Sequence, residues 1–156
     1  MALCALGLTI WQTRVTRKHN RLSVKPYLNT ERLIKHNPTI LTVNLVNNGL
    51  GPATIDKFEF CLRDGSPLPD SGDVSLLHTM ESYFPEHAAH IMTFYMRPNY
   101  AIVAGEKKVL LEMVFKCESP PSEDFIDAQL KKVRLIVKYK SIYKEVFEYD
   151  SIRDQK

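Results

Sequence analysis

The chain has 156 residues, of which 44% are hydrophobic, 25% are charged and 10% are aromatic. This composition excludes collagen-like, low-complexity and wholly disordered chains, and the length predicts one domain. The net charge of +3 is too small a surplus to indicate a nucleic-acid-binding protein. We therefore expect one folded domain with no nucleic acid partner.

The charges are distributed unevenly along the chain. Residues 1–12 contain no Asp, Glu, Lys or Arg, whereas residues 13–36 carry seven basic side chains against Glu31 alone, a local charge of +6. The first 11 residues, MALCALGLTIW, contain nothing more polar than Thr9. As a helix they would rise about 16 Å, roughly half of the 30 Å hydrocarbon core of a bilayer. The sequence therefore predicts an apolar leader and a basic juxtamembrane collar over residues 1–21.

Three interpretations of the leader remain open: a secretory signal peptide, a very short or incomplete membrane anchor, and a short buried helix. A signal peptide is disfavoured because no basic residue precedes the apolar run and no A-x-A site follows it. An anchor is favoured because Trp11 lies at the apolar-to-polar boundary and basic residues follow at once. The predicted membrane-proximal residues are Trp11, Arg14, Arg17, Lys18 and Arg21. They predict a body attached to the inner membrane and facing the cytoplasm, with a soluble or periplasmic body as the alternative.

The rest of the chain has the pattern of short β-strands. Apolar and polar residues alternate in segments that give about seven strands, with candidates at 22–28, 40–46, 53–62, 91–96, 100–103, 109–117, 133–140 and 143–149. Short helices are expected at 73–82, capped by Asp73, and at 123–130, capped by Ser122. No long helix alternates with the strands, which favours an antiparallel β-sandwich over residues 22–150, followed by a polar tail at 151–156.

Two resemblances add to this pattern. Residues 45–53, LVNNGLGPA, followed by Phe58, Phe60 and an Asp-Gly turn, resemble bacterial immunoglobulin-like domains of the cell-adhesion-related type. The whole layout, from the leader through RKHNRLSVKP to the terminal YKSIY, is similar to a group of uncharacterised bacterial membrane-anchored proteins. The resemblances imply an all-β, antiparallel immunoglobulin-like β-sandwich with a short N-terminal apolar helix, and they imply no particular activity.

The loop at residues 47–52 is the candidate interaction loop. Asn and Gly tolerate positive φ, and proline cannot donate a hydrogen bond to a strand, so the pattern predicts a tight crossing loop. The residues that make up this candidate loop site are Asn47, Asn48, Gly49, Gly51 and Pro52. We expect the loop and residues 66–90 to form the exposed end of the body, where a partner binds.

No motif predicts a reaction. Residues 49–51, GLG, lack the third glycine or the Gly-Lys-Ser/Thr of a phosphate-binding loop, and a strand rather than a helix follows them. Cys61 and Cys117 end apolar runs and are typical of small buried hydrophobes. His78, Glu81, His87 and His90 lie within 13 residues, and a helical turn at 87–90 would present two imidazoles to one metal ion.

We therefore predict a non-catalytic, membrane-associated adaptor or scaffold domain that binds lipid and an unknown protein partner. We expect no catalytic residues, no cofactor and no metal. One alternative is a metal-dependent enzyme or small-ligand binder that uses residues 78–90. The other is an extracytoplasmic adhesion or carbohydrate-binding module, in which a disulfide between Cys61 and Cys117 would be plausible.

Overall fold

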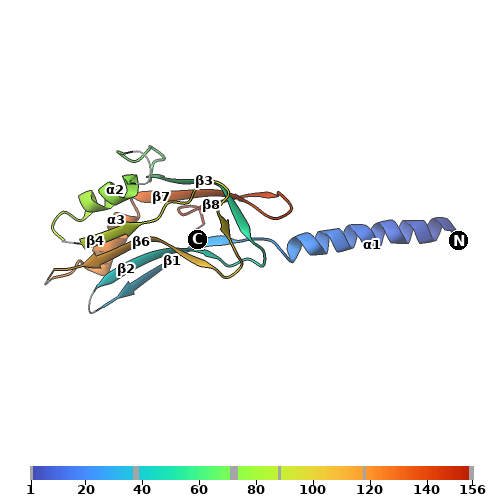
Figure 1. Cartoon of the computed structure of the whole chain (residues 1–156), viewed down its shortest axis with the longest axis horizontal. Helices are drawn as coiled ribbons and strands as arrows, with labels where there is room; N and C mark the ends of the chain where they lie inside the picture. Colours follow the sequence, from blue (N-terminus) through green and yellow to red (C-terminus); the bar gives the residue numbers. More distant parts are fainter. Residues whose placement is uncertain (1, 37–38, 71–73, 88, 118, 155–156) are drawn as a thin grey trace.

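The computed structural model describes residues 2–36, 39–70, 74–87, 89–117 and 119–154. A long helix, α1 (Ala2–Leu22), projects from a two-sheet body (Figure 1). The other elements are, in chain order, β1 (Leu28–Lys35), β2 (Ile40–Asn47), β3 (Ala53–Leu62), α2 (Ser75–Tyr83), β4 (Ala89–Thr93), β5 (Ala101–Ile102), β6 (Lys107–Phe115), α3 (Glu123–Leu130), β7 (Val133–Lys140) and β8 (Val146–Asp150).

The body consists of two antiparallel sheets of four strands each. Their strand orders are β1-β2-β6-β4 and β5-β3-β7-β8. Apolar side chains of both sheets share one core cluster, to which β2 contributes Leu45, β3 contributes Phe58 and β7 contributes Val137. The hydroxyls of Thr30 in β1 and Tyr149 in β8 lie 2.6 Å apart, so the two edge strands also meet. The sheets are therefore stacked in a sandwich-like arrangement.

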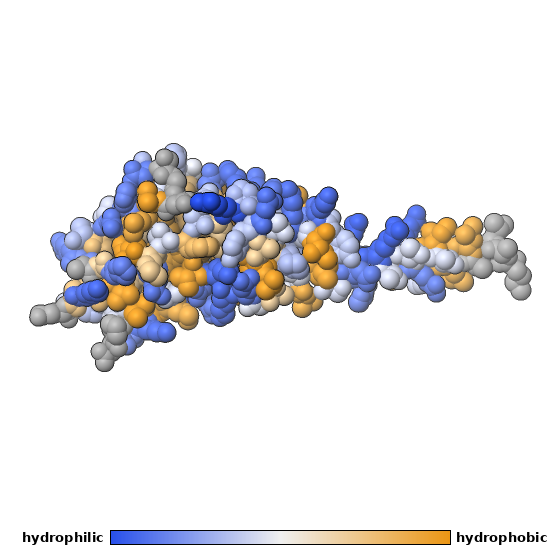
Figure 2. Space-filling view, in the orientation of Figure 1, coloured by the Kyte–Doolittle hydropathy of each residue, from blue (hydrophilic) through white to orange (hydrophobic). Residues whose placement is uncertain are grey.

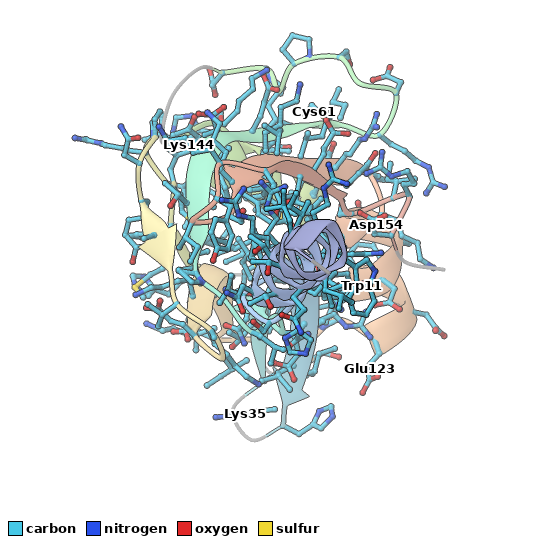
Figure 3. The ribbon with its side chains drawn as sticks, turned by 90° about the vertical axis from the view of Figure 1, so that its right-hand side faces the viewer. Trp11, Lys35, Cys61, Glu123, Lys144 and Asp154 are labelled. Carbon is cyan, nitrogen blue, oxygen red and sulfur yellow. The ribbon has the colours of Figure 1, made fainter. Side chains whose placement is uncertain are left out.

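The body has two distinct ends. We call the end joined to α1 the near end, and the end where α2 and α3 lie the far end (Figure 1). Viewed from the side of α1, the helix stands end-on in front of the body (Figure 3). β3 runs from the near end to the far end, and its ten residues span about 33 Å.

Most of the expected elements are confirmed, with shifted ends. β2 and β3 begin at the expected residues, and α3 begins where Ser122 was expected to cap it, since the Ser122 hydroxyl accepts from the Phe125 amide at 3.3 Å. α2 begins at Ser75, and the residue before it, Val74, makes no side-chain cap. The expected cap, Asp73, lies outside the described residues.

The expected first strand, residues 22–28, is wrong. The helix continues through the basic collar to Leu22, and the first strand runs from Leu28 to Lys35. Arg, Lys and Gln favour a helix, and no proline occurs before Pro26, so nothing in the collar stops the helix. β8 also begins later than expected, at Val146, because residues 141–145 form the turn, in which Lys144 has a φ of 62°.

Candidate membrane interface and its junction with the body

α1 separates apolar from polar residues along its axis. The exposed apolar side chains of its outer half are Leu6, Leu8, Ile10 and Trp11. From Gln12 onward most side chains are polar or basic, and Figure 2 shows the change from orange to blue toward the body. Leu6 and Leu8 are about 200° apart around the helix, so the apolar surface surrounds the axis instead of forming one face. Such a helix fits a membrane entered end-on better than one lying flat on the surface.

One side-chain hydrogen bond lies at the boundary between the two halves. The Thr13 hydroxyl donates to the Thr9 carbonyl oxygen at 2.8 Å. The bond is of the i to i−4 kind that threonine makes within a helix.

The predicted basic residues lie on one face of α1. Arg14, Arg17, Lys18 and Arg21 are spaced i, i+3, i+4 and i+7, which places them in one stripe of an α-helix. Within the described chain, Arg14, Arg17 and Lys18 make no ion pair. Arg21 differs, because its guanidinium lies 3.8 Å from the Glu145 carboxylate and 5.9 Å from the centre of the Tyr143 ring. Arg21 therefore attaches the helix to the turn between β7 and β8 as well.

The segment that leaves α1 is held by the loop after β2. We call residues 47–52 the junction loop and residues 24–27 the connecting segment. A Cβ atom on Gly51 would lie 1.9 Å from the Val24 carbonyl oxygen, and one on Gly49 would lie 2.3 Å from a backbone nitrogen of the connecting segment. Glycine is needed at both positions because the two backbones touch there.

Asn47 is the centre of this junction. Its side chain is fully buried, and its Oδ1 accepts from the amides of Tyr27 and Gly49, each at 3.1 Å. Its Nδ2 donates to the carbonyl oxygens of Gly51 at 2.8 Å and Ile102 at 3.0 Å. The backbone N–H and C=O of Asn47 are paired with the turn after β5. This one side chain therefore joins the connecting segment, the junction loop and β5.

The junction loop is not the open surface that the sequence suggested. Asn47 and Gly51 are buried, whereas Asn48 and Leu50 are exposed. The loop lies at the near end, whereas residues 66–90 follow β3 at the far end, so the two segments do not form one exposed end. That expectation was wrong because β3 runs the length of the body between them.

The histidines do not form the expected helical pair. α2 ends before Pro85 and His90 lies in β4, so His87 and His90 are not on one helical turn. His78 is paired instead with Asp70, whose Oδ2 lies 2.8 Å from its Nδ1. Among the residues that the structure describes, no three His, Cys, Asp or Glu side chains are grouped so that they could hold a metal ion.

A buried ion pair at the C-terminus has no sequence signal. Arg134 in β7 binds both carboxylate oxygens of Asp150 in β8, at 3.0 and 2.5 Å. Asp150 also accepts from the Ile152 amide, and these bonds, chiefly those from Arg134, lower the pKa of Asp150 to about 2. The two partners are 16 positions apart in the sequence, so only the pairing of β7 with β8 brings them together. The pair fixes the turn after β8.

The cysteines are free thiols where the structure describes them. Cys61 is buried, as expected, and burial raises the pKa of its thiol, while Cys117 is only partly buried. Burial suits a small packing residue in β3.

Comparisons with known proteins leave the resemblances without support or contradiction. No family model, curated protein or solved structure matches the chain. No helix in the described part of the chain combines the length and the apolar character needed to cross a membrane.

Proposed function

We propose that the protein is a non-catalytic domain that α1 attaches to a membrane and whose body binds another protein. The observation that carries this proposal is the division of α1 into an apolar outer half and a basic inner half. In the proposed arrangement the outer half enters one leaflet end-on, Trp11 lies at the interface, and the basic stripe contacts anionic headgroups. Each Lys or Arg near such a surface contributes about 1 kcal/mol.

The junction supports the same arrangement. A domain that needed only a tether would be served by a flexible linker. Here the connecting segment is bonded to Asn47, and Arg21 bonds the helix end to Glu145. The connecting segment is therefore fixed to the body, and the Arg21 contact adds a second point of attachment at the end of α1, which favours a function in which orientation at the membrane matters.

We infer further that the body belongs to the immunoglobulin-like class. The strand order β1-β2-β6-β4 corresponds to strands A-B-E-D of that fold, and β3-β7-β8 corresponds to C-F-G. β5, with two residues, is an addition at the edge of the second sheet. This correspondence supports the class that the resemblance implied.

The partner surface that we propose is β4 and the neighbouring strand β6. β4 is an edge strand, because within the described residues it pairs with β6 alone, and an edge strand can pair with an added strand. Met92, Phe94 and Val109 are 52%, 43% and 42% exposed. An extended segment of a partner protein would extend the sheet and cover these side chains.

Vesicle binding tests the membrane half of the proposal. The triple variant Arg14→Glu, Arg17→Glu and Lys18→Glu should bind vesicles of phosphatidylcholine and phosphatidylserine about 100-fold more weakly, since three attractions of about 1 kcal/mol are lost. The matched control reverses three exposed cations of the body, Lys35, Arg97 and Lys116. Trp11 is the only tryptophan, so its fluorescence should shift to shorter wavelength on binding. If Trp11 stays in water with every vesicle, the proposal is wrong.

A second comparison tests the proposed binding of a partner protein. The double variant Met92→Asp with Phe94→Asp should no longer co-purify with a protein that binds both the wild-type chain and the control variant with reversed body cations. If all three retain the same proteins, β4 is not the binding surface.

A further inference from the structure

A cavity of about 670 Å³ opens between the two sheets toward the far end. Its lining comes from strands of both sheets and from α2 and α3. Ligand cavities of proteins fall in the range of about 300–1,000 Å³. The size therefore suits one small molecule.

The cavity lies where the apolar core divides. One core cluster contributes Leu110 and Leu135 to its wall, and the other contributes Leu76, Met80 and Leu111. Protein interiors are otherwise close-packed. The cavity therefore touches both clusters, and the apolar lining residues that are only partly buried include Val43, Phe60, Leu130 and Val133, which an apolar molecule would contact.

The mouth of the cavity has an excess of positive charge. Three of its charged side chains are already in ion pairs, because Arg32 contacts Asp127 and Glu31 binds Lys107 at 2.6 Å.

The other two cations at the mouth are Arg63 and Lys131, and both are exposed. Arg63 donates to the Lys131 carbonyl oxygen at 3.4 Å, which brings the two residues together. Within the described residues neither side chain forms an ion pair. Two exposed cations that line the same cavity, and that form no ion pair among the described residues, offer charge-assisted hydrogen bonds to an anionic group at its mouth.

We propose that this cavity binds an amphiphile with an apolar body and a single anionic head, namely a long-chain fatty acid. The chain lies against the partly buried apolar side chains of Val43, Phe60 and Val133. The carboxylate lies at the rim between Arg63 and Lys131. This site is separate from α1 and from the outer face of β4.

Titration of the full chain with oleate tests the proposal, using isothermal calorimetry without vesicles and below the micelle concentration. The expected result is saturable binding of one oleate per chain. The double variant Arg63→Glu with Lys131→Glu should bind oleate at least tenfold more weakly and should bind oleyl alcohol, which has no charge, as the wild type does. The matched control, Arg97→Glu with Lys116→Glu, reverses two exposed cations that do not line the cavity and should bind oleate normally.

A cavity-filling variant tests where the chain lies. Val133 lines the cavity and is only partly buried, so Val133→Phe should reduce binding of both oleate and oleyl alcohol at least tenfold. If this variant does not fold, the rim variant decides alone. Because Trp11 is the only tryptophan and lies in α1, an unchanged Trp11 spectrum shows that oleate has not bound along the helix.

The proposal is overturned if the wild type shows no saturable binding, or if reversal of Arg63 and Lys131 leaves oleate affinity unchanged. It is also overturned if folded Val133→Phe binds as the wild type does. None of these results depends on membrane attachment, which the vesicle experiment measures separately.

Discussion

Replacing Asn47 by Asp would preserve the shape of the side chain and remove its two donors. The two amides that donate to Oδ1 would keep an acceptor. The other oxygen would face the carbonyl oxygens of Gly51 and Ile102 at the positions now 2.8 and 3.0 Å from Nδ2. Two buried hydrogen bonds would be replaced by two repulsive contacts, in a side chain that solvent does not reach.

The expected loss of stability is about 3 kcal/mol at pH 8, from two buried carbonyls that each lose a partner at 1–3 kcal/mol. With a urea m-value of about 2 kcal/mol per molar, the unfolding midpoint would fall by about 1.5 M. The loss should depend on pH, because the carbonyl oxygens favour the protonated carboxyl. The pKa of the introduced carboxyl would thus be higher in the folded state than in the unfolded chain. Stability would then recover as pH falls through that raised pKa toward pH 4.

Asn48→Asp is the matched control, since Asn48 is the neighbouring residue, is exposed and undergoes the same change of charge. Its effect should stay within about 0.5 kcal/mol. The difference between the two variants, measured by urea unfolding from pH 4 to pH 8, isolates the buried site from the titration of the rest of the chain. If the two variants unfold alike, or if their difference does not shrink at low pH, Asn47 does not bond as described.

Three further changes test other parts of the structure by urea unfolding. Asp150→Asn should lower the free energy of unfolding by about 2 kcal/mol at pH 7. The Asp150 carboxyl has a pKa of about 2 against the ordinary 3.8, so it stabilises the wild type above pH 4, and this gain is lost as pH falls toward 2. If the variant loses as much stability as the wild type over that pH range, the ion pair is contradicted. Gly51→Ala should lower the free energy of unfolding by at least 2 kcal/mol, because the new Cβ would collide with the Val24 carbonyl. It should also speed proteolysis between α1 and the body. Gly7→Ala, with open space around its Cβ, serves as its control, and equal effects would contradict the close approach. Ser122→Ala should cost about 1 kcal/mol through loss of the α3 cap, and a neutral result would show that this cap is replaced.

The sequence predicted the strands whose two faces differ in polarity. β2 alternates along ILTVNLV, and β3 is bounded by the junction loop and an Asp-Gly turn, so both could be assigned. β1 could not, because it is an edge strand in which Glu31, Arg32 and Lys35 interrupt the alternation.

The positions of the predicted site residues were only partly predictable from the sequence. The basic stripe is present in the sequence as spacings of three and four, yet it becomes a face only if the helix is known to continue to Leu22. The composition of the junction loop predicted a tight crossing. It did not predict that Asn47 would be buried, because the connecting segment and Ile102 that cover it are distant in sequence. The cavity could not be predicted from the sequence for the same reason, since its lining residues come from many separate elements.

The geometry of the two proposed sites determines how a ligand would reach the cavity. If α1 enters the membrane as far as Trp11, the 11 residues from Gln12 to Leu22 raise the body by about 16 Å. β1 from Leu28 to Arg32 adds about 13 Å, so the mouth lies roughly 30 Å from the apolar boundary, whereas the headgroup layer is only about 5–8 Å thick. A fatty acid must therefore cross water to enter. We expect the rate of oleate transfer from vesicles to the protein to be independent of vesicle concentration and unchanged in the variant with Arg14, Arg17 and Lys18 reversed. A rate that rises with vesicle concentration and falls in that variant would mean that the mouth meets the membrane directly, and that α1 does not stand end-on.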